Sequence, residues 1–395
     1  MNALVQEEGT RAALVGTYRP AAPLFIAGEG CRLLDADGKS YLDFASGIGV
    51  NALGYGDAGI RAALLGALDC GLIHTSNLFR TAPAERLAAE LAAHSFADRV
   101  FFSNSGAEAN EAAFKFARRW ARTQGGAEKH EIVALRGAFH GRLFGALAAT
   151  DRPAMQEPFA PLMPGVRFVP VGDVAALYAA ISTAHTAAII AEPIQGEGGV
   201  QALPAEFARA LRTAADAANA LLIFDEVQCG LGRTGTLFAH ELLGVAPDIM
   251  TLAKPLAAGL PMGATLLTER VAAAVQPGDH ATTFGGGPLV ASVALEFLRR
   301  VANPDFLGTV QRTGAVLGAA LRELQKQAAV TAVRGVGLMW GLELAVPAAP
   351  VVAAALANGL LVTAAGERVV RLLPPLTLSA PEAEEGVAIL AEVLA

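Results

Sequence analysis

Two short apolar runs each end at a charged residue, and the two charges together suggest a chemistry. Leu221–Phe224 leads into Asp225, and Ile249–Ala253 leads into Lys254. Such runs are typical of buried parallel strands, and open α/β sheets bind ligands beyond the carboxyl ends of their strands. There, a lysine can hold an aldehyde cofactor as a Schiff base, and an aspartate can keep a pyridine nitrogen protonated. Surface charges are the alternative, but the apolar residues favour burial, and buried charges need partners.

The segment Asn104–Asn110 (NSGAEAN) predicts a helix N-terminus that could bind a phosphate. Ser105 and Glu108 fit a capping box at the start of a long helix. The free N–H groups and the positive dipole of such an end attract anions, and the small residues Gly106 and Ala107 would let a phosphate approach. An ordinary helix cap with no ligand is the alternative.

Two further segments, Ala138–Arg142 (AFHGR) and Glu192–Gly199 (EPIQGEGG), follow strand candidates and carry polar groups. Phe139 could stack on a planar ring, and Arg142 could bind a carboxylate through two hydrogen bonds. A core phenylalanine and a solvated arginine are the alternatives. His140 could equally be a packed structural histidine or a catalytic one. The two carboxylates of the second segment are either solvated or a pair for glycoside cleavage, although nothing else in the sequence indicates a sugar cleft.

The composition argues against several classes of protein. Of the 395 residues, 53% are hydrophobic, which allows a large core, and the net charge of -7 gives no basic surface for nucleic acid. Cys31, Cys70 and Cys229 match neither a disulfide framework nor a zinc site, so we expect a reducing, cytoplasmic setting. The uncharged stretches Val174–Ala191 and Leu344–Gly366 are alanine-rich or broken by proline, so neither is expected to span a membrane.

Two other patterns resemble nucleotide-binding motifs but lack their context. LLIFDE and Gly38-Lys39-Ser40 resemble parts of a phosphate-loop ATPase, but that motif requires a glycine where Leu33 stands. Gly47–Ala52 (GIGVNA) matches a dinucleotide fingerprint, but no helix is predicted directly after it. A hairpin turn and a glycine-rich loop are the better interpretations.

The order of predicted elements indicates an α/β protein with two domains. Strands alternate with helices through the middle of the chain, which favours a mostly parallel sheet with crossover helices. After Pro288, two long helices, a strand over Val333–Leu344 and a last strand and helix predict a smaller α+β domain. We expect an N-terminal arm and part of the small domain in residues 1–45, the large domain in 46–288 and the rest of the small domain in 289–395. The expected strands of the large domain are Val100–Phe102, Glu131–Leu135, Ala187–Ala191, Leu221–Phe224 and Ile249–Ala253.

Taken together, the motifs resemble the class III, or ω-, aminotransferases that use pyridoxal 5′-phosphate, and within them the acetylornithine aminotransferase group. The resemblance runs from about Tyr18 to the C-terminus, and the order of the motifs makes it highly specific. It departs from the family at Tyr55, usually histidine, and at Gly287, usually asparagine. It implies a fold-type I transferase with a large parallel-sheet domain, helices on both faces and a small α+β domain. The motifs are YLDFASGIGVNALGY, NSGAEANEAAFKFARRW, AFHGR, EPIQGEGGV, LLIFDEVQCGLGRTG, PDIMTLAKPLAAGLPMGA, TTFGGGPL and VVRLLPPLTL.

The resemblance also implies roles at a cofactor site. Lys254 would bind the cofactor's aldehyde and move a proton, Asp225 would partner the pyridine nitrogen, and Gln228 would donate to the ring hydroxyl. Phe139 would stack on the ring. Because one phosphate contact is expected from a neighbouring subunit, with Thr282 close to the substrate, the resemblance implies at least a homodimer. The groups expected at the phosphate are Ser105, Gly106, Ala107 and Thr283 of the neighbouring subunit.

For the substrates, the resemblance implies a carboxylate clamp at Arg142 and an ion pair between Glu197 and Arg371 that acts as a gate. With Arg371 paired, the site suits an aliphatic ω-amine, and with Arg371 released it can bind the second carboxylate of a 2-oxo diacid. The expected reaction moves the terminal amino group of N2-acetylornithine to 2-oxoglutarate, giving glutamate and a semialdehyde, in arginine biosynthesis. Succinylornithine, ornithine, 4-aminobutyrate and a carrier-bound aminoadipate semialdehyde are alternatives. A mutase or racemase is the alternative from another class.

Overall fold

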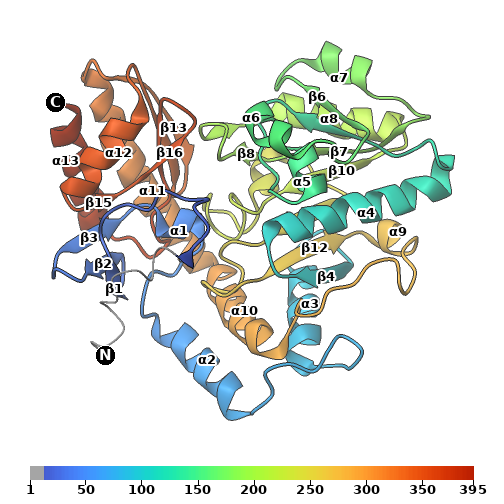
Figure 1. The fold of residues 1–395 in the computed structure, drawn as a ribbon, viewed down its shortest axis with the longest axis horizontal. Helices are drawn as coiled ribbons and strands as arrows, with labels where there is room; N and C mark the ends of the chain where they lie inside the picture. Colours follow the sequence, from blue (N-terminus) through green and yellow to red (C-terminus); the bar gives the residue numbers. More distant parts are fainter. Residues whose placement is uncertain (1–12) are drawn as a thin grey trace.

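A seven-stranded sheet forms the centre of the larger part of the protein (Figure 1). The computed structural model describes residues 13–395, so residues 1–12 of the expected N-terminal arm lie outside the described residues. Across the sheet, the strands follow the order β4-β12-β11-β10-β7-β5-β6. Their bounds are Arg99–Ser103 for β4, Glu131–Leu135 for β5, Val166–Val169 for β6, Thr186–Ala191 for β7, Leu221–Asp225 for β10, Ile249–Leu252 for β11 and Gly263–Leu267 for β12.

The sheet is mostly parallel, as the sequence predicts. Neighbouring strands run parallel except around β12, which is antiparallel to both β4 and β11. The five strands expected from the sequence are confirmed as β4, β5, β7, β10 and β11. The sequence does not predict β6 (VRFV) or β12 (GATLL), because segments so short, with mixed polarity or small residues, carry little periodic signal.

Helices cover both faces of the sheet, which explains why its strands are continuously apolar. Leu221 and Ile223 pack into the core shared with helix α4 (Gly106–Gly125). Leu222 and Phe224, which alternate with them, pack into the opposite core with α7 (Val174–Ala180) and α8 (Ala205–Ala217). The expected fold class, with helices on both faces, is therefore confirmed.

The C-terminal part contains a four-stranded sheet in the order β13-β14-β17-β16, beside α11, α12 and α13 (Figure 1). The prediction of one strand over Val333–Leu344 is wrong, because the chain folds there into an antiparallel hairpin. Gly337 makes the turn with a φ of 56°, a conformation that glycine adopts without strain. The bounds are Val330–Val336 for β13, Met339–Leu344 for β14, Thr363–Ala365 for β16, Val369–Leu372 for β17, Pro304–Glu323 for α11, Ala348–Ala357 for α12 and Ala380–Leu394 for α13.

The N-terminal strands join the C-terminal part of the chain. The predicted meander is confirmed as β1 (Phe25–Glu29), β2 (Arg32–Asp35) and β3 (Ser40–Asp43), paired antiparallel. β3 then pairs in parallel with β15 (Leu360–Leu361), far away in sequence. This pairing agrees with an N-terminal segment that shares the small domain, although the domain boundaries after residues 45 and 288 stay predictions.

The remaining elements link the two parts. The helices α2 (Ala58–Asp69) and α3 (Ala82–Ala93) each pack on α10 (Pro288–Val301) at one end of the molecule (Figure 1). Among residues 13–395, the cysteines are free and no group of metal-ligating side chains is found. None of the helices in that range has the length and apolar character needed to cross a membrane. The short elements are α1 Ser46–Gly49, α5 Phe144–Ala148, α6 Pro153–Gln156, η2 Glu157–Phe159, β8 Ile194–Gln195, β9 Gln201–Ala202, η3 Ala239–Leu243, α9 Glu269–Ala272 and η4 Leu324–Lys326.

Replacement of Gly386 by alanine should destabilise the contact between the two ends of the chain. A Cβ at Gly386 on α13 would lie 2.3 Å from Cζ of buried Phe44, just after β3. Overpacking costs about 1–3 kcal/mol, which exceeds the gain of about 1 kcal/mol or less from removing a helical glycine. We expect Gly386→Ala to lower the thermal unfolding midpoint by several degrees. Gly66→Ala on α2, where a Cβ meets nothing within 4 Å, should preserve or raise the midpoint, and equal midpoints would contradict the packing argument.

Candidate active site

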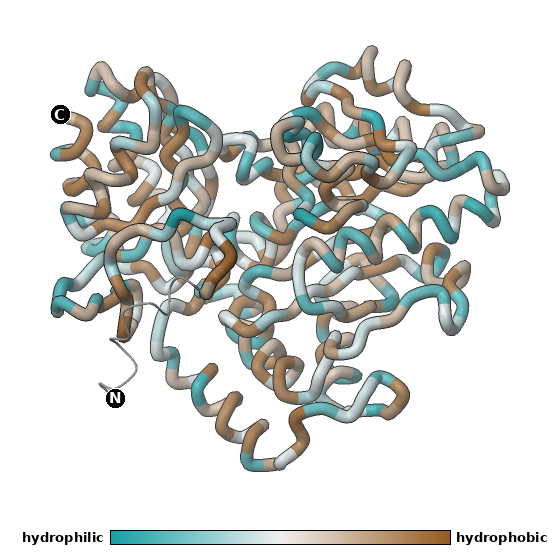
Figure 2. The backbone as a smooth tube through the Cα atoms, in the orientation of Figure 1, coloured by the Kyte–Doolittle hydropathy of each residue, from teal (hydrophilic) through white to brown (hydrophobic). Residues whose placement is uncertain are grey.

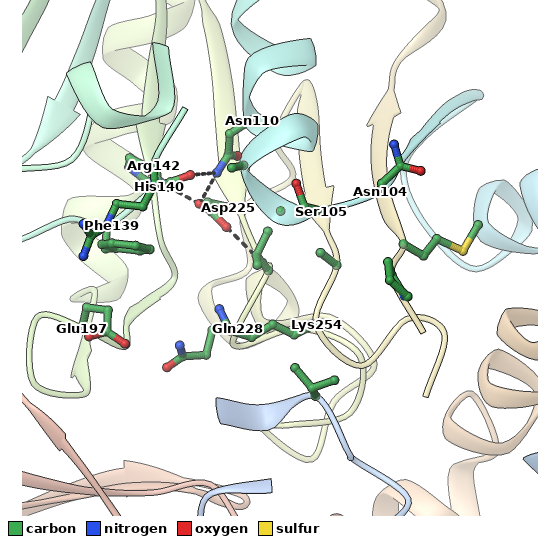
Figure 3. A pocket seen from close by; sticks show the side chains of 18 of the residues that line it. Asn104, Ser105, Asn110, Phe139, His140, Arg142, Glu197, Asp225, Gln228 and Lys254 are labelled. Atoms are coloured by element: carbon green, nitrogen blue, oxygen red, sulfur yellow. Dashed lines mark hydrogen bonds and ion pairs between the residues drawn. The ribbon is translucent and has the colours of Figure 1, made fainter. Parts of the chain in front are cut away.

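A cavity of about 410 Å³ lies at the carboxyl ends of β10 and β11 and brings most of the predicted site residues together (Figure 3). Its walls come from the N-terminus of α4, from the loops after β5, β7, β10 and β11, and from Val50 in the N-terminal segment. The predicted residues that line it are Ser105, Gly106, Ala107, Phe139, Arg142, Glu197, Asp225, Gln228 and Lys254.

The carboxylate of Asp225 is buried at the base of this cavity and fixed by three hydrogen bonds. Its Oδ2 accepts from Nδ2 of Asn110 at 2.8 Å and lies 2.7 Å from Nδ1 of His140. Its Oδ1 accepts from the backbone N–H of Val227 at 3.0 Å. An ionised carboxylate only accepts hydrogen bonds, so His140 carries its proton on Nδ1 when Asp225 is ionised. The carboxylate therefore cannot turn away from the cavity without losing partners.

Asn110 is a site residue that the sequence analysis did not single out. It lies one turn into α4 on the buried face, and its Oδ1 accepts from Oγ1 of Thr251 at 2.8 Å. Its Nδ2 also donates to the backbone carbonyl of His140 at 2.7 Å. The available signal is an amide among alanines on the apolar face of an amphipathic helix, where a buried polar group must have partners. His140, whose role was open, is here a partner of Asp225.

Lys254 reaches the same cavity from the loop after β11, and Figure 3 shows it in the same pocket as Asp225. Loss of hydration lowers the pKa of Lys254, and the nearby Asp225 carboxylate partly opposes this effect. A lowered pKa increases the fraction of neutral amine at neutral pH, which a lysine needs to attack a carbonyl or to accept a proton. The predicted lysine and aspartate therefore share one cavity.

The N-terminus of α4 faces the cavity with two N–H groups that are free to bind a ligand. Oγ of Ser105 caps the helix by accepting from the backbone of Glu108 at 3.2 Å. The predicted capping box is only half formed, because the Glu108 carboxylate accepts from the backbone of Asn104 instead. The backbone N–H groups of Gly106 and Ala107 have no acceptor within the helix, since they belong to its first turn. These groups and the helix dipole can hold a phosphate.

A buried carboxylate shapes the wall that carries Phe139. Oε1 of Glu192 accepts from the backbone N–H of Phe139 at 3.0 Å, and Oε2 accepts from that of Gly196 at 3.3 Å. Burial raises the pKa of Glu192 to about 7, although the neighbouring His140 opposes the shift. Glu192 is therefore not a solvated acid, and it holds the loop of Phe139 in place. The exposed Arg142 guanidinium lies 5.9 Å from the Phe139 ring centroid.

Arg371, on β17, reaches the cavity wall from the C-terminal part of the chain. Its buried Nη1 donates to Oε1 of Glu197 at 2.5 Å and to Oε1 of Gln228 at 3.2 Å. Its Nε donates to Oγ1 of Thr363 at 3.2 Å. The ion pair expected between Glu197 and Arg371 therefore forms. Because Oε1 of Gln228 is used in this way, its Nε2 is the group that can donate into the cavity.

Thr282 and Thr283 do not line the cavity of their own chain. Oγ1 of Thr282 accepts from Nδ2 of Asn104 at 3.2 Å, and Thr283 is exposed on the outer side of the same loop. Both line surface hollows next to β4 instead. Their expected contact with a neighbouring subunit's site stays a prediction.

The cavity residues fit pyridoxal phosphate as a set. Asp225 offers a fixed carboxylate to a ring nitrogen, Phe139 offers an aromatic face, and Lys254 offers an amine with a lowered pKa to an aldehyde. The helix end at Gly106 offers N–H groups to a phosphate, and a Cβ there would lie 2.6 Å from Cγ1 of Val227. Only glycine therefore keeps this end closely packed and free of side chains.

Comparisons with known proteins agree with this geometry. The aminotransferase class-III family matches residues 18–394. An acetylornithine aminotransferase of Alnus glutinosa is 50% identical over 98% of this chain and 87% of its own length. An acetylornithine aminotransferase of Xanthomonas campestris is 46% identical over 94% and 92% of the two chains.

Solved structures show the same likeness. The N-acetylornithine aminotransferase of Stenotrophomonas maltophilia superposes with a TM-score of 0.83 at 37% identity, over 95% of this chain and 96% of its own. An ornithine aminotransferase of Toxoplasma gondii, with pyridoxal phosphate in partial occupancy at its active site, superposes with a TM-score of 0.92 at 31% identity, over 97% and 92%. The chain therefore belongs to the class-III aminotransferases, and it is a transaminase that uses pyridoxal 5′-phosphate.

Proposed function

We propose that the protein moves the terminal amino group of an N2-acylated ornithine, with N2-acetylornithine as the preferred donor, to 2-oxoglutarate. The observation that carries this proposal is the ion pair between Arg371 and Glu197 in the cavity wall. Arg142 lies in the same cavity and has no carboxylate partner among the residues that the structure describes. The site therefore offers one free cation while Arg371 is paired and a second when it is released.

This arrangement suits two substrates of different charge. The donor has one carboxylate, which Arg142 binds, and an aliphatic ω-amine, which a second free cation would repel. The acceptor has two carboxylates, and Arg371 can bind the second when Glu197 turns out. Glu197 is about a third exposed whereas Arg371 is almost fully buried, so Glu197 is the partner that has room to move.

The bound cofactor supplies an electron sink that weakens the bonds at the amino-bearing carbon of the substrate. Lys254 would hold the cofactor through its aldehyde, and Nζ, when free, would accept and return the proton that moves during transfer. Asp225 would keep the ring nitrogen protonated, and the carboxylate is held in place by its hydrogen bonds to Asn110 and His140. Phe139 supports the ring face. Ser105, Gly106 and Ala107 hold the phosphate, and Nε2 of Gln228 donates to the ring hydroxyl.

The preference for an acylated donor is supported by the relatives and by the apolar part of the cavity. The relatives with the highest identities given above are named acetylornithine aminotransferases. Val50, Leu260 and Met262 add apolar surface to the cavity lining, which suits a neutral acyl group better than the charged α-amine of free ornithine. Ornithine is the second candidate, because the Toxoplasma gondii ornithine aminotransferase shares the fold at a TM-score of 0.92.

A second copy of the chain completes the site in this proposal. The segment between α2 and α3 exposes Leu78 and Phe79 at 88% and 69%, and Phe284 is 66% exposed. Figure 2 shows hydrophobic colour on α2 and on the segment that follows it. The ring centroids of His74 and Phe284 are 5.3 Å apart, and Leu78 lines the same surface hollow as Thr283, so these residues form an apolar patch beside Thr283. Patches of this kind mark protein interfaces, and a partner seated here would receive Thr283 at its own cavity.

Initial rates with a set of amino donors test the proposed reaction. With 2-oxoglutarate as acceptor, we expect kcat/KM for N2-acetylornithine to exceed that for ornithine and 4-aminobutyrate at least tenfold, because the cavity offers a single free cation and an apolar side. Succinylornithine should fall between them. Lys254→Ala, the matched control, should show none of these activities above background. A higher kcat/KM for ornithine would favour the second candidate, and turnover without any 2-oxo acid would indicate a mutase or racemase.

The Glu197→Ala variant tests the proposed gate. Without Glu197, Arg371 is always free to bind a carboxylate, so glutamate should become a better donor relative to N2-acetylornithine. A charged hydrogen bond is worth about 1.5–3 kcal/mol, so we expect the ratio of the two kcat/KM values to shift by about tenfold or more. Glu206→Ala, on the exposed start of α8, is the control and should not change the ratio. An unchanged ratio in Glu197→Ala would remove the gate from the mechanism.

A charge placed in the apolar patch tests the homodimer. Phe79→Asp should convert the dimer to monomer in sedimentation velocity and lower kcat at least tenfold, because each cavity would lose the partner's Thr283. The control is Val174→Asp, at an apolar residue that is 41% exposed at the start of α7 on the far side of the sheet. It should leave both sedimentation and activity unchanged. A monomeric wild-type protein with full activity would contradict the shared site.

A further inference from the structure

A second cavity, of about 330 Å³, lies at the end of α4 that points away from the active site and is lined by an excess of cations. Lys115, Arg118, Arg119 and Arg122 come from α4, and Lys129 comes from the segment after it. This end of the helix is at the edge of the molecule, where Figure 2 shows mainly hydrophilic residues. Within the lining that the structure describes, Asp279 is the one carboxylate.

Part of this charge is already satisfied by the protein. Nζ of the buried Lys129 donates to the backbone carbonyls of Thr183 and Ala218 at 2.7 and 2.9 Å, so Lys129 contributes its stem to the cavity and not a free ammonium. Nε of Arg119 pairs with Oδ2 of Asp279 at 2.7 Å, which accounts for the one acid. Nζ of Lys115 lies 2.9 Å from Nδ1 of His280. Burial and the charge of Lys115 lower the pKa of His280, so the imidazole is neutral and only accepts the bond. The positive charge of Lys115 therefore remains.

The two other arginines of the helix also keep their charge. Nε and Nη2 of Arg118 donate to the backbone carbonyls of His130 and Pro164 at 2.9 and 2.6 Å, which uses two of its five N–H groups. The side chain of Arg122 has no hydrogen-bond or ion-pair partner among residues 13–395 and stands exposed at the rim. Arg118 and Arg122 are four residues apart, so they present their guanidinium groups on the same side of α4.

A bound anion would relieve the repulsion between the cations that stay unpaired. Arg118 and Arg122 are like charges at positions i and i+4 of the helix, which is a destabilising arrangement. The helix dipole favours cations only in the last turn, which explains Arg122 but not Lys115 or Arg118. The protein as a whole carries a net charge of -7, so a general excess of cations does not explain it.

We propose that this cavity binds a small anion with two linked phosphate groups. Its volume lies at the lower end of small-molecule sites, which is larger than a single phosphate requires. Arginine binds phosphate oxygens through two parallel hydrogen bonds, and Arg118 and Arg122 each have N–H groups left for one phosphate. Inorganic pyrophosphate and a nucleoside diphosphate share this chemistry, and both can be tested as sources.

The site is separate from the one that holds the cofactor's phosphate. The active-site cavity contacts α4 no further along than Asn110, whereas the second cavity contacts it from Lys115 to Arg122, and no residue lines both cavities. Arg122, at the far end of the second cavity, is sixteen residues from Gly106 along the helix, which corresponds to roughly 24 Å. A diphosphate at the second site therefore does not compete with the cofactor, and the measurement can be made on the cofactor-loaded enzyme.

Calorimetric titration of the cofactor-loaded enzyme with pyrophosphate and with ADP tests the proposal. We expect saturable binding of one anion per chain. Arg122→Ala should weaken it about tenfold or more, and Asp279→Asn, which removes the one carboxylate, should tighten it severalfold. Arg209→Ala is the matched control, since Arg209 is an exposed helical arginine on α8 that does not line the cavity. Transaminase activity should be unchanged in Arg122→Ala, so a failure here leaves the proposed reaction intact.

The competing outcomes are distinct. Equal binding of pyrophosphate and ADP supports the proposal with the diphosphate as the recognised group, and tighter binding of ADP supports it with a nucleotide as the source. The proposal is overturned if neither anion binds saturably, if inorganic phosphate binds as tightly as pyrophosphate, or if Arg209→Ala weakens binding as much as Arg122→Ala. Lys115 is also exposed, so Lys115→Gln provides a second variant, and it should weaken anion binding as Arg122→Ala does.

Discussion

The active site depends on one buried carboxylate, Asp225, that is held ready for a partner. Burial of a charge is unfavourable unless hydrogen bonds compensate for lost water, and here α4, the loop after β5 and the turn after β10 each supply a donor. These elements must therefore meet at one point. The parallel arrangement of β10 with β7 and β11 brings the loops to the same edge, and α4 crosses the sheet so that Asn110 reaches Asp225.

The same helix serves the site in a second way. The first turn of α4 points its N–H groups into the cavity, and one turn later Asn110 fixes the carboxylate. A shift of α4 along its axis would move the phosphate end and the support of Asp225 together. The hydrogen bond from Thr251 to Asn110 and that from Thr265 to the backbone of Ala109 tie the helix to β11 and β12, so the sheet itself sets this distance. The spacing between the Asp225 carboxylate and the free N–H groups of the first turn is thus built into the packing of one helix on one sheet.

The sequence predicts the parts of the protein whose signal is local. Apolar runs that end at Asp225 and Lys254, and the capped start of α4, give strand ends and a helix end directly. It does not predict Asn110 or the buried role of Glu192, because each acts through partners far away in the chain, such as Asp225 and the backbone of Phe139. The antiparallel direction of β12 cannot be predicted from its own residues either, because the direction of a strand depends on the topology of the whole sheet and not on local composition. The turn at Gly337 was missed because glycines alternate with apolar residues on both sides of it, so the hairpin looks like one strand.

Tyr55, which stands where the resembled family usually has histidine, stabilises the N-terminal segment beside the active-site cavity. Residues 46–49 form a turn with positive φ, including 63° at the β-branched Ile48, and such a conformation costs of order 1–3 kcal/mol. Asp43 offsets this strain, because its Oδ1 accepts from the backbone of Ala45 and Ser46, and its Oδ2 accepts from the Tyr55 hydroxyl at 2.7 Å. Burial raises the pKa of Tyr55, so the hydroxyl remains a donor at all ordinary pH. The strained turn is followed directly by Val50 in the cavity wall, so the Asp43–Tyr55 contact helps to set the shape of that wall.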